Sequence, residues 1–316
     1  MKIPELKIGN LKAKLPIIQG GMAVRISTAR LAAQVANEGA IGVIAGTGLN
    51  PQELTDEIKL ARSLTDGIIG VNVLYAVKDF ALLVKTAISS SIDLVISGAG
   101  FSREIFTWGR ETDTAILPVV SSARLAILAE RLGAKAVIVE GTEAGGHLGT
   151  DRRLVDILPE VVKKVEIPVI GAGGIIDGFD IAKILNLGAS GVQMGTRFAA
   201  SVESNASDAM KKSYITATKD DVISVTSPVG LPGRAIRNRF TDKINGDKVK
   251  ITKCNNCLKA CSHRYCIMDA LLEASSFGSG AEEKALFFAG SCVDRIKEIL
   301  PVKEIINNLK KELKMA

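Results

Sequence analysis

The first two thirds of the chain repeat one unit: a short apolar run, a glycine-bearing turn and a helical pattern. The stretches between the runs, such as 27–38 and 122–133, have the periodicity of amphipathic helices. This alternation predicts an α/β fold built on a parallel sheet. The apolar runs of strand length lie at 15–19, 40–45, 68–74, 93–97, 115–120, 134–139, 167–171 and 190–195.

Eight strand–helix units in about 200 residues predict a closed (β/α)8 TIM barrel. An open, doubly wound sheet has the same alternation and is the alternative. The glycine-rich turns favour the barrel, because they follow the first, sixth, seventh and eighth runs at their carboxyl ends. In a barrel these ends meet on one face, where active sites lie.

After about residue 200 the alternation stops. Residues 219–253 contain turn signals and many basic residues, and we expect them to be irregular. We predict that 1–200 and 286–316 form the barrel, with a final helix from 302 to 315 packed back on it. Residues 201–285 are predicted to form a smaller inserted lobe over the barrel mouth.

Composition narrows the class of protein. Apolar residues make up 47% of the chain and aromatic residues 4%, so the core must consist mainly of Ile, Val, Leu and Ala. The net charge of +6 does not by itself indicate nucleic-acid binding. No apolar run reaches the ~18 residues of a membrane span, and the N-terminal residues lack a signal-peptide core. We expect a cytoplasmic protein, and a homodimer is a possible assembly.

Residues 140–149, Glu-Gly-Thr-Glu-Ala-Gly-Gly-His-Leu-Gly, contain one of the two histidines of the chain. Histidine titrates nearest neutrality and suits proton transfer. Reactive groups also concentrate on loops held by rigid scaffolds. His147 is therefore the candidate catalytic residue, and a loop histidine without a role is the alternative.

Two turns are predicted to hold a phosphate: Gly171-Ala172-Gly173-Gly174 after the seventh run, and Gly195-Thr196-Arg197 after the eighth. Backbone N–H groups free of Cβ crowding can line an anion, and the following helix N-terminus favours negative charge. Ordinary turn chemistry explains one such turn. Two in adjacent units match the usual phosphate site of a barrel.

The first run ends in Gln19-Gly20-Gly21-Met22, where backbone can lie flat against a ring system. Asn72, near the end of the third run, offers a donor and an acceptor, which suits a pyrimidine edge. The alternative is a buried Asn satisfied by backbone. With His147, these features predict a flat phosphorylated cofactor, most simply FMN.

Five segments closely resemble the nitronate monooxygenase family, and most of all its FMN-dependent enoyl-acyl-carrier-protein reductase II branch. They are Gln-Gly-Gly-Met, Gly-Val-Asn-Val, residues 140–149, Ile-Pro-Val-Ile-Gly-Ala-Gly-Gly-Ile and Gln-Met-Gly-Thr-Arg-Phe. The resemblance covers 15–200, and 289–290 with 298–310 is similar to the closing segment of the family. It implies FMN in a TIM barrel with His147 beside the isoalloxazine. The cofactor-binding positions inside these motifs are Gly20, Gly21, Met22, Asn72, Glu140, Gly145, Gly146, Ala172, Gly173, Gly174, Gln193, Gly195 and Thr196.

Cys254, Cys257, Cys261 and Cys266 have the spacing C-x2-C-x3-C-x4-C, while Cys292 stands apart. Soft thiolates select iron–sulfur clusters or zinc, and so compact a run is nearer to cluster ligation. We expect a [4Fe-4S] cluster, with zinc or unmetallated thiols as alternatives; His263 could replace one ligand. The motif departs from the family pattern and resembles the cysteine run beside FMN in 2,4-dienoyl-CoA reductase-type enzymes.

The expected function is an FMN-dependent reductase. A hydride would pass from NAD(P)H or from the cluster, through the flavin, to an activated double bond such as that of an enoyl thioester. A nitronate monooxygenase that uses O₂ is the first alternative, and a non-catalytic flavin- or metal-binding scaffold is the second. An exposed cluster is oxidation-prone, which favours the reductase.

A run of basic residues raises the question of a partner. They could steer an acidic carrier protein or a CoA phosphate to the site. A solvated surface is the simpler interpretation, since charged residues are mostly exposed. The residues are Arg234, Arg237, Arg239, Lys243, Lys248, Lys250, Lys253 and Lys259.

Overall fold

Eight parallel strands form one sheet in the order β3-β11-β10-β8-β7-β6-β5-β4. The sheet closes between β3 and β4, where Ile41 N donates to Ile17 O and Gln19 N donates to Ile41 O, each at 2.9 Å. The protein is therefore a (β/α)8 barrel, as predicted, and not an open sheet. The strands are β3 Ile17–Gln19, β4 Gly42–Ala45, β5 Ile69–Leu74, β6 Leu94–Gly98, β7 Ala115–Val120, β8 Val137–Glu140, β10 Val169–Ala172 and β11 Gly191–Met194. The computed structural model describes residues 2–246, 249, 251, 254–275 and 283–316.

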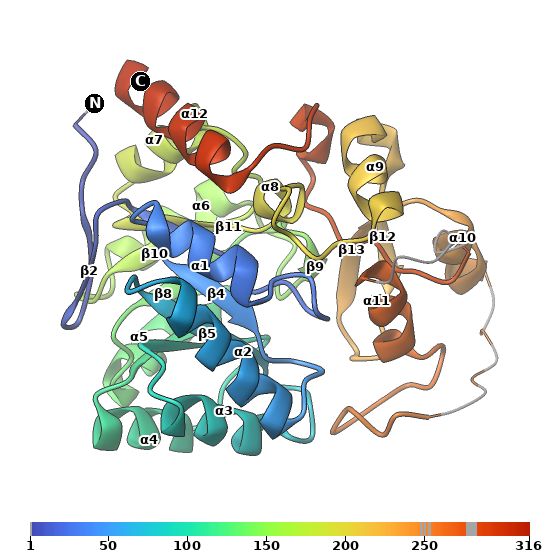
Figure 1. Ribbon diagram of the computed structural model, residues 1–316, viewed down its shortest axis with the longest axis horizontal. Helices are drawn as coiled ribbons and strands as arrows, with labels where there is room; N and C mark the ends of the chain where they lie inside the picture. The colour runs from blue at the N-terminus through green and yellow to red at the C-terminus, as the bar shows by residue number, and fades with distance from the viewer. Residues whose placement is uncertain (1, 247–248, 250, 252–253, 276–282) are drawn as a thin grey trace.

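Helices follow the strands and cover the outside of the barrel (Figure 1). Local signals set their ends: α2 starts at Pro51, and Asn50 and Glu53 form a reciprocal capping box before its first turn. Gly133, in the left-handed conformation, ends α5 as predicted. The helices are α1 Ala29–Asn37, α2 Pro51–Leu64, α3 Phe80–Ser89, α4 Glu104–Thr112, α5 Ala123–Leu132, α6 Leu154–Val162, α7 Gly178–Asn186 and α8 Thr196–Ala199.

The last helix, α12 Val302–Met315, completes the outer ring as predicted. It packs between α7 and α1, and Gly178 N donates to Glu312 Oε2 at 2.8 Å. At the opposite end from the lobe, the hairpin of β1 Leu6–Ile8 and β2 Leu11–Ala13 covers the barrel (Figure 1). Its side chains pack on strand residues of the barrel interior. Both additions bury apolar surface that the barrel would otherwise expose.

The remaining elements lie beside the carboxyl ends of the strands (Figure 1). The expectation of irregular structure over 219–253 is wrong for the described part, because β12 and β13 form an antiparallel hairpin. β13 also pairs with β9 Gly146–His147 of the barrel, a long-range contact that local sequence does not signal. The domain boundaries at 200 and 286 stay a prediction. The elements are α9 Asp208–Thr216, β12 Val222–Thr226, β13 Pro232–Ile236, α10 Arg239–Gly246 and α11 Ile267–Ser275.

Among the described residues, none of the helices has the length and apolar character needed to cross a membrane.

Candidate active site

A cavity of about 680 Å³ opens at the carboxyl ends of the strands. Its volume lies in the range of small-molecule sites. His147 and every residue predicted to bind the cofactor line it, including Gly145, Gly146 and Ala172. The barrel thus brings together positions that lie more than 170 residues apart in the sequence. Their roles stay predictions.

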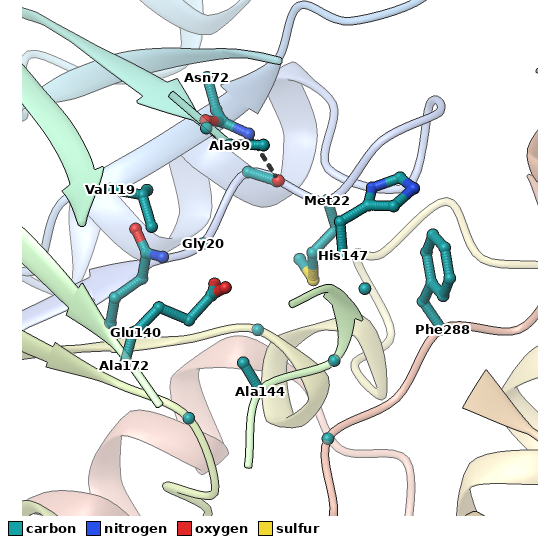
Figure 2. A pocket seen from close by; sticks show the side chains of 18 of the residues that line it. Gly20, Met22, Asn72, Ala99, Val119, Glu140, Ala144, His147, Ala172 and Phe288 are labelled. Atoms are coloured by element: carbon teal, nitrogen blue, oxygen red, sulfur yellow. Dashed lines mark hydrogen bonds between the residues drawn. The ribbon is translucent and has the colours of Figure 1, made fainter. Parts of the chain in front are cut away.

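The turn after β3 is held by Asn72. Asn72 Nδ2 donates to Gly21 O at 3.0 Å, drawn as the dashed line in Figure 2. A Cβ at Gly21 would lie 2.3 Å from Asn72 Cβ, so only glycine fits there. The alternative of a backbone-satisfied Asn therefore holds for the amide nitrogen, while Asn72 still lines the cavity. Asn72 fixes the flat Gly20-Gly21 surface as well as facing the ligand space.

The turn after β10 forms a cradle of backbone. Gly173 and Gly174 have φ of +116° and +71°, which side chains of L-residues rarely adopt. A Cβ at Gly173 would lie 3.0 Å from Ala144 N. The turn after β10 therefore packs closely against the glycine-rich loop that follows β8. The expected helix N-terminus does not contribute here: the first N–H groups of α7 are taken by Asp177 and Glu312.

In the turn after β11, the side chain of Arg197 binds carbonyl groups of the chain. The Arg197 guanidinium donates to Ala200 O at 2.7 Å and to Glu298 O at 2.8 Å, so it fixes the chain beneath the cavity. Thr196 Oγ1 accepts from Gly290 N at 2.9 Å and ties this turn to the closing segment. Gly195 and Thr196 line the cavity, and Arg197 does not.

Two polar side chains lie deep in the cavity. Glu140, at the end of β8, points into the open space (Figure 2), and burial raises its pKa to about 8. Gln193 Oε1 is buried without a hydrogen-bond partner among the described residues. A buried amide oxygen without a partner is costly. A ligand with hydrogen-bond donors would satisfy it, and a flavin ring carries such a donor.

His147 lies at the boundary between the barrel and the lobe. β9 pairs with β13, which places His147 opposite Gly233. Its Nε2 lies 2.8 Å from Ser227 Oγ, and its ring makes an edge contact with Phe288, with centroids 5.3 Å apart (Figure 2). Burial lowers the pKa of His147 to about 4, so the imidazole is neutral at neutral pH. His147 therefore has specific protein partners, and its catalytic role stays a prediction against the alternative of a loop histidine without a role.

The lobe, together with Leu286 and Phe288 directly after it, supplies an apolar wall that the sequence reasoning did not identify. The wall consists of Met210, Tyr214, Leu231, Leu271, Leu286 and Phe288, which line the cavity opposite the glycine turns. Tyr214 OH donates to Phe288 O at 2.8 Å and fixes that part of the wall. Ser227 was also missed: its Ser-Pro dipeptide indicated only a turn. The apolar alternation of 222–226 was the signal available for this hairpin.

The metal expectation is not supported. Within 254–275 and the other described residues, no group of three or more Cys, His, Asp or Glu side chains could hold a metal ion. The sulfurs have local partners instead. Cys254 Sγ accepts from Asn256 N at 3.4 Å and Cys261 Sγ accepts from His263 N at 3.4 Å. Asn255 Nδ2 donates to Cys266 Sγ at 3.2 Å, and Cys257, like the other cysteines, is a free thiol.

The cysteine segment nevertheless contacts the barrel mouth. Lys78 N donates to Cys257 O, and Lys259 N donates to Ala76 O, each at 2.9 Å. Lys259 Nζ donates to Tyr75 O at 2.7 Å and lies 3.7 Å from the centre of the Tyr75 ring. Because Tyr75 lines the cavity, this segment supports the cavity wall from outside.

Several of the basic residues have local partners. Arg234 Nε donates to Thr142 O at 3.1 Å, and Arg239 pairs with Glu283 at 2.7 Å. Arg237 Nε lies 3.9 Å from Asp242 Oδ1. Lys248, Lys250 and Lys253 lie outside the described residues. A carrier-protein partner stays a prediction.

The sequence as a whole matches one family model, that of nitronate monooxygenase, over residues 5–312. The chain belongs to the nitronate monooxygenase family. A probable nitronate monooxygenase of Staphylococcus aureus (strain JH9) is 30% identical over 280 residues, which cover 74% of this chain and 79% of that protein. Membership in this flavin-dependent family makes the chain an oxidoreductase, and the non-catalytic alternative is not supported.

Solved structures agree with this family assignment. FabK from Thermotoga maritima has a TM-score of 0.87 and 36% identity, covering 96% of this chain and 94% of that chain. A nitroalkane oxidase from Streptomyces ansochromogenes has a TM-score of 0.82 and 26% identity, covering 96% of both chains. Both alignments cover 96% of this chain, so they include the added elements as well as the barrel.

Proposed function

We propose that this protein is an FMN-dependent reductase of an activated carbon–carbon double bond, with an enoyl thioester as substrate class and NAD(P)H as electron donor. The observation that carries the proposal is the cavity itself, which extends from the glycine cradle to the apolar wall of the lobe. A flat phosphorylated cofactor matches the cradle, and an apolar acyl chain matches the wall. A reductase that receives its electrons from an iron–sulfur cluster is not supported, because the described residues contain no group that could hold a metal ion.

The residues fit FMN. Gln193 Oε1 has no hydrogen-bond partner among the described residues, and a donor on the cofactor would satisfy it. The Gly173-Gly174 turn presents main-chain atoms to the cavity in a positive-φ conformation that other residues adopt only with strain. The Gly20-Gly21 surface held by Asn72 suits one face of a ring system. FMN, when bound, supplies hydride chemistry between a nicotinamide and an electron-poor double bond.

The chain itself provides orientation and hydrogen bonds. Glu140 is protonated at neutral pH and can donate a hydrogen bond deep in the cavity. His147 is neutral, so it acts as a hydrogen-bonding or proton-accepting group and not as an imidazolium acid. The apolar wall excludes water and strengthens both interactions.

Anaerobic turnover of the purified holoenzyme tests the proposal. We expect heat denaturation to release FMN and not FAD. We expect NADH or NADPH to reduce the bound flavin. We expect a medium-chain enoyl thioester to reoxidise the flavin faster than an enoyl thioester whose acyl chain is two carbons shorter. Release of FAD, or failure of all enoyl thioesters to reoxidise the flavin, would count against the reductase.

Alkyl nitronate oxidation is the second candidate, favoured by the name of the staphylococcal relatives. The same holoenzyme in air with propyl nitronate decides between the two. Nitronate turnover without thioester reduction would assign the oxygen-using reaction.

A further inference from the structure

The hydroxyl of Ser227 is the polar group that meets the imidazole of His147. The separation between Ser227 Oγ and His147 Nε2 is 2.8 Å, and Ser227 is 1% exposed. The two residues are 80 positions apart in the chain and belong to different parts of the fold. Because Ser227 is buried, its hydroxyl must find its partners within the protein.

The surroundings of Ser227 are compatible with a hydrogen bond from its hydroxyl to His147 Nε2. Val229 N donates to Ser227 Oγ at 3.3 Å, and a backbone N–H can act only as a donor. The oxygen therefore accepts there, and its single hydrogen is free to point at His147 Nε2. An imidazole that accepts at Nε2 and is neutral must carry its hydrogen on Nδ1.

Rigid neighbours hold both partners in place. Ser227 N donates to Leu231 O at 3.2 Å and Gly230 N donates to Ser227 O at 3.0 Å, which closes the turn between β12 and β13. On the other side, Leu148 N donates to Pro232 O at 2.9 Å, next to the β9–β13 pairing. Phe288 covers the edge of the imidazole. Rotation of the His147 ring would break the serine contact.

We propose that Ser227 is a positioning residue that holds His147 as its Nδ1–H tautomer, so that the histidine presents a hydrogen-bond donor to the substrate. The role of that donor rests on the proposed function, whereas the tautomer does not. A thioester carbonyl beside the reacting double bond is the acceptor that such a donor would polarise. A base that removes a proton from a nitroalkane would need the lone pair that Ser227 occupies.

Nitrogen-15 NMR of histidine-labelled, oxidised holoenzyme tests the tautomer directly. The chain has only two histidines, so a His263→Gln variant assigns the His147 signals. We expect a protonated Nδ1 and a hydrogen-bonded, unprotonated Nε2 in the unaltered enzyme. In Ser227→Ala we expect a mixture of tautomers with flavin content unchanged. A protonated Nε2 in the unaltered enzyme, or an unchanged tautomer in Ser227→Ala, would overturn the proposal.

Steady-state kinetics adds a second readout. We expect Ser227→Ala to lower kcat about tenfold with little change in KM, the loss of one oriented hydrogen bond. Ser227→Thr retains the hydroxyl and should recover most of the rate. Ser224→Ala removes an exposed serine of β12, three residues before Ser227, and serves as the matched control. If thioester reduction fails in every variant while the tautomer behaves as expected, the proposed function is wrong and the positioning role stands.

Discussion

Asn72 and Gly21 lie in direct contact: the Asn72 amide donates to the Gly21 carbonyl at 3.0 Å, and a Cβ on Gly21 would overlap Asn72 Cβ. This contact joins the ends of β3 and β5 across the barrel mouth. It defines the flat backbone surface on one side of the cavity. Any side chain at position 21 must therefore displace Asn72 or the turn itself.

Gly21→Ala should abolish flavin binding. The added methyl would lie 2.3 Å from Asn72 Cβ, and overpacking of this kind typically costs about 1–3 kcal/mol. Absorbance of bound flavin and the melting temperature measure the two effects. Gly246→Ala is the control, because a Cβ there meets none of the described residues within 4 Å. Retention of full flavin content in Gly21→Ala would contradict the assigned role of this surface.

His147→Gln should leave flavin content largely unchanged and lower turnover by about 10²–10³, the range for a lost hydrogen-bond donor to a developing oxyanion. The reason is that His147 lines the cavity at the lobe, away from the glycine cradle. His263→Gln, the other histidine, should behave as the unaltered enzyme. Equal turnover in both variants would remove His147 from the mechanism.

Glu140 should make the flavin-free protein less stable as the pH rises. Because burial raises its pKa to about 8, the stabilisation is full below about pH 4.5 and is lost as the pH rises through 8. Each pKa unit corresponds to about 1.4 kcal/mol, so several kcal/mol is the upper limit. Melting temperatures at pH 6 and pH 9.5 should diverge in the unaltered chain and converge in Glu140→Gln. Glu304→Gln, at an exposed position of α12, should not change the profile.

Lys259→Met should weaken the support of the cavity wall. The methionine keeps the apolar stem but loses the hydrogen bond to Tyr75 O and the cation–π contact, worth about 0.5–1 kcal/mol at exposed sites. We expect a higher KM for the acceptor with flavin content unchanged. Lys243→Met on α10 is the matched control. An unaltered KM in Lys259→Met would show that the cysteine segment does not support the wall.

Parts of the fold were predictable because their causes are local. The eight apolar runs lie within two or three residues of the observed strands, since a strand buried on both faces must be apolar throughout. Gly133 and the capping box at Asn50 act within a few residues. The cradle at Gly173-Gly174 was predicted because positive φ leaves a glycine signature.

Other predictions failed where the cause is not local. The partners of the Arg197 guanidinium, the carbonyls of Ala200 and Glu298, were not foreseen, while the phosphate turn itself stays a prediction. The four cysteines have a spacing typical of metal sites, yet spacing does not fix where the thiols point. The 222–236 hairpin was missed because the strand with which β13 pairs, β9, lies far away in the sequence.

The sequence by itself determined the barrel, its carboxyl-end cavity and the candidate histidine, because periodicity, glycine turns and rare residue types are written along the chain. Tertiary structure alone decided what His147 meets. Ser227 and Phe288 reach it through a strand pairing and a closing segment that lie 80 and 141 residues away. The protonation state of a buried imidazole depends on those distant neighbours, and no local pattern records them.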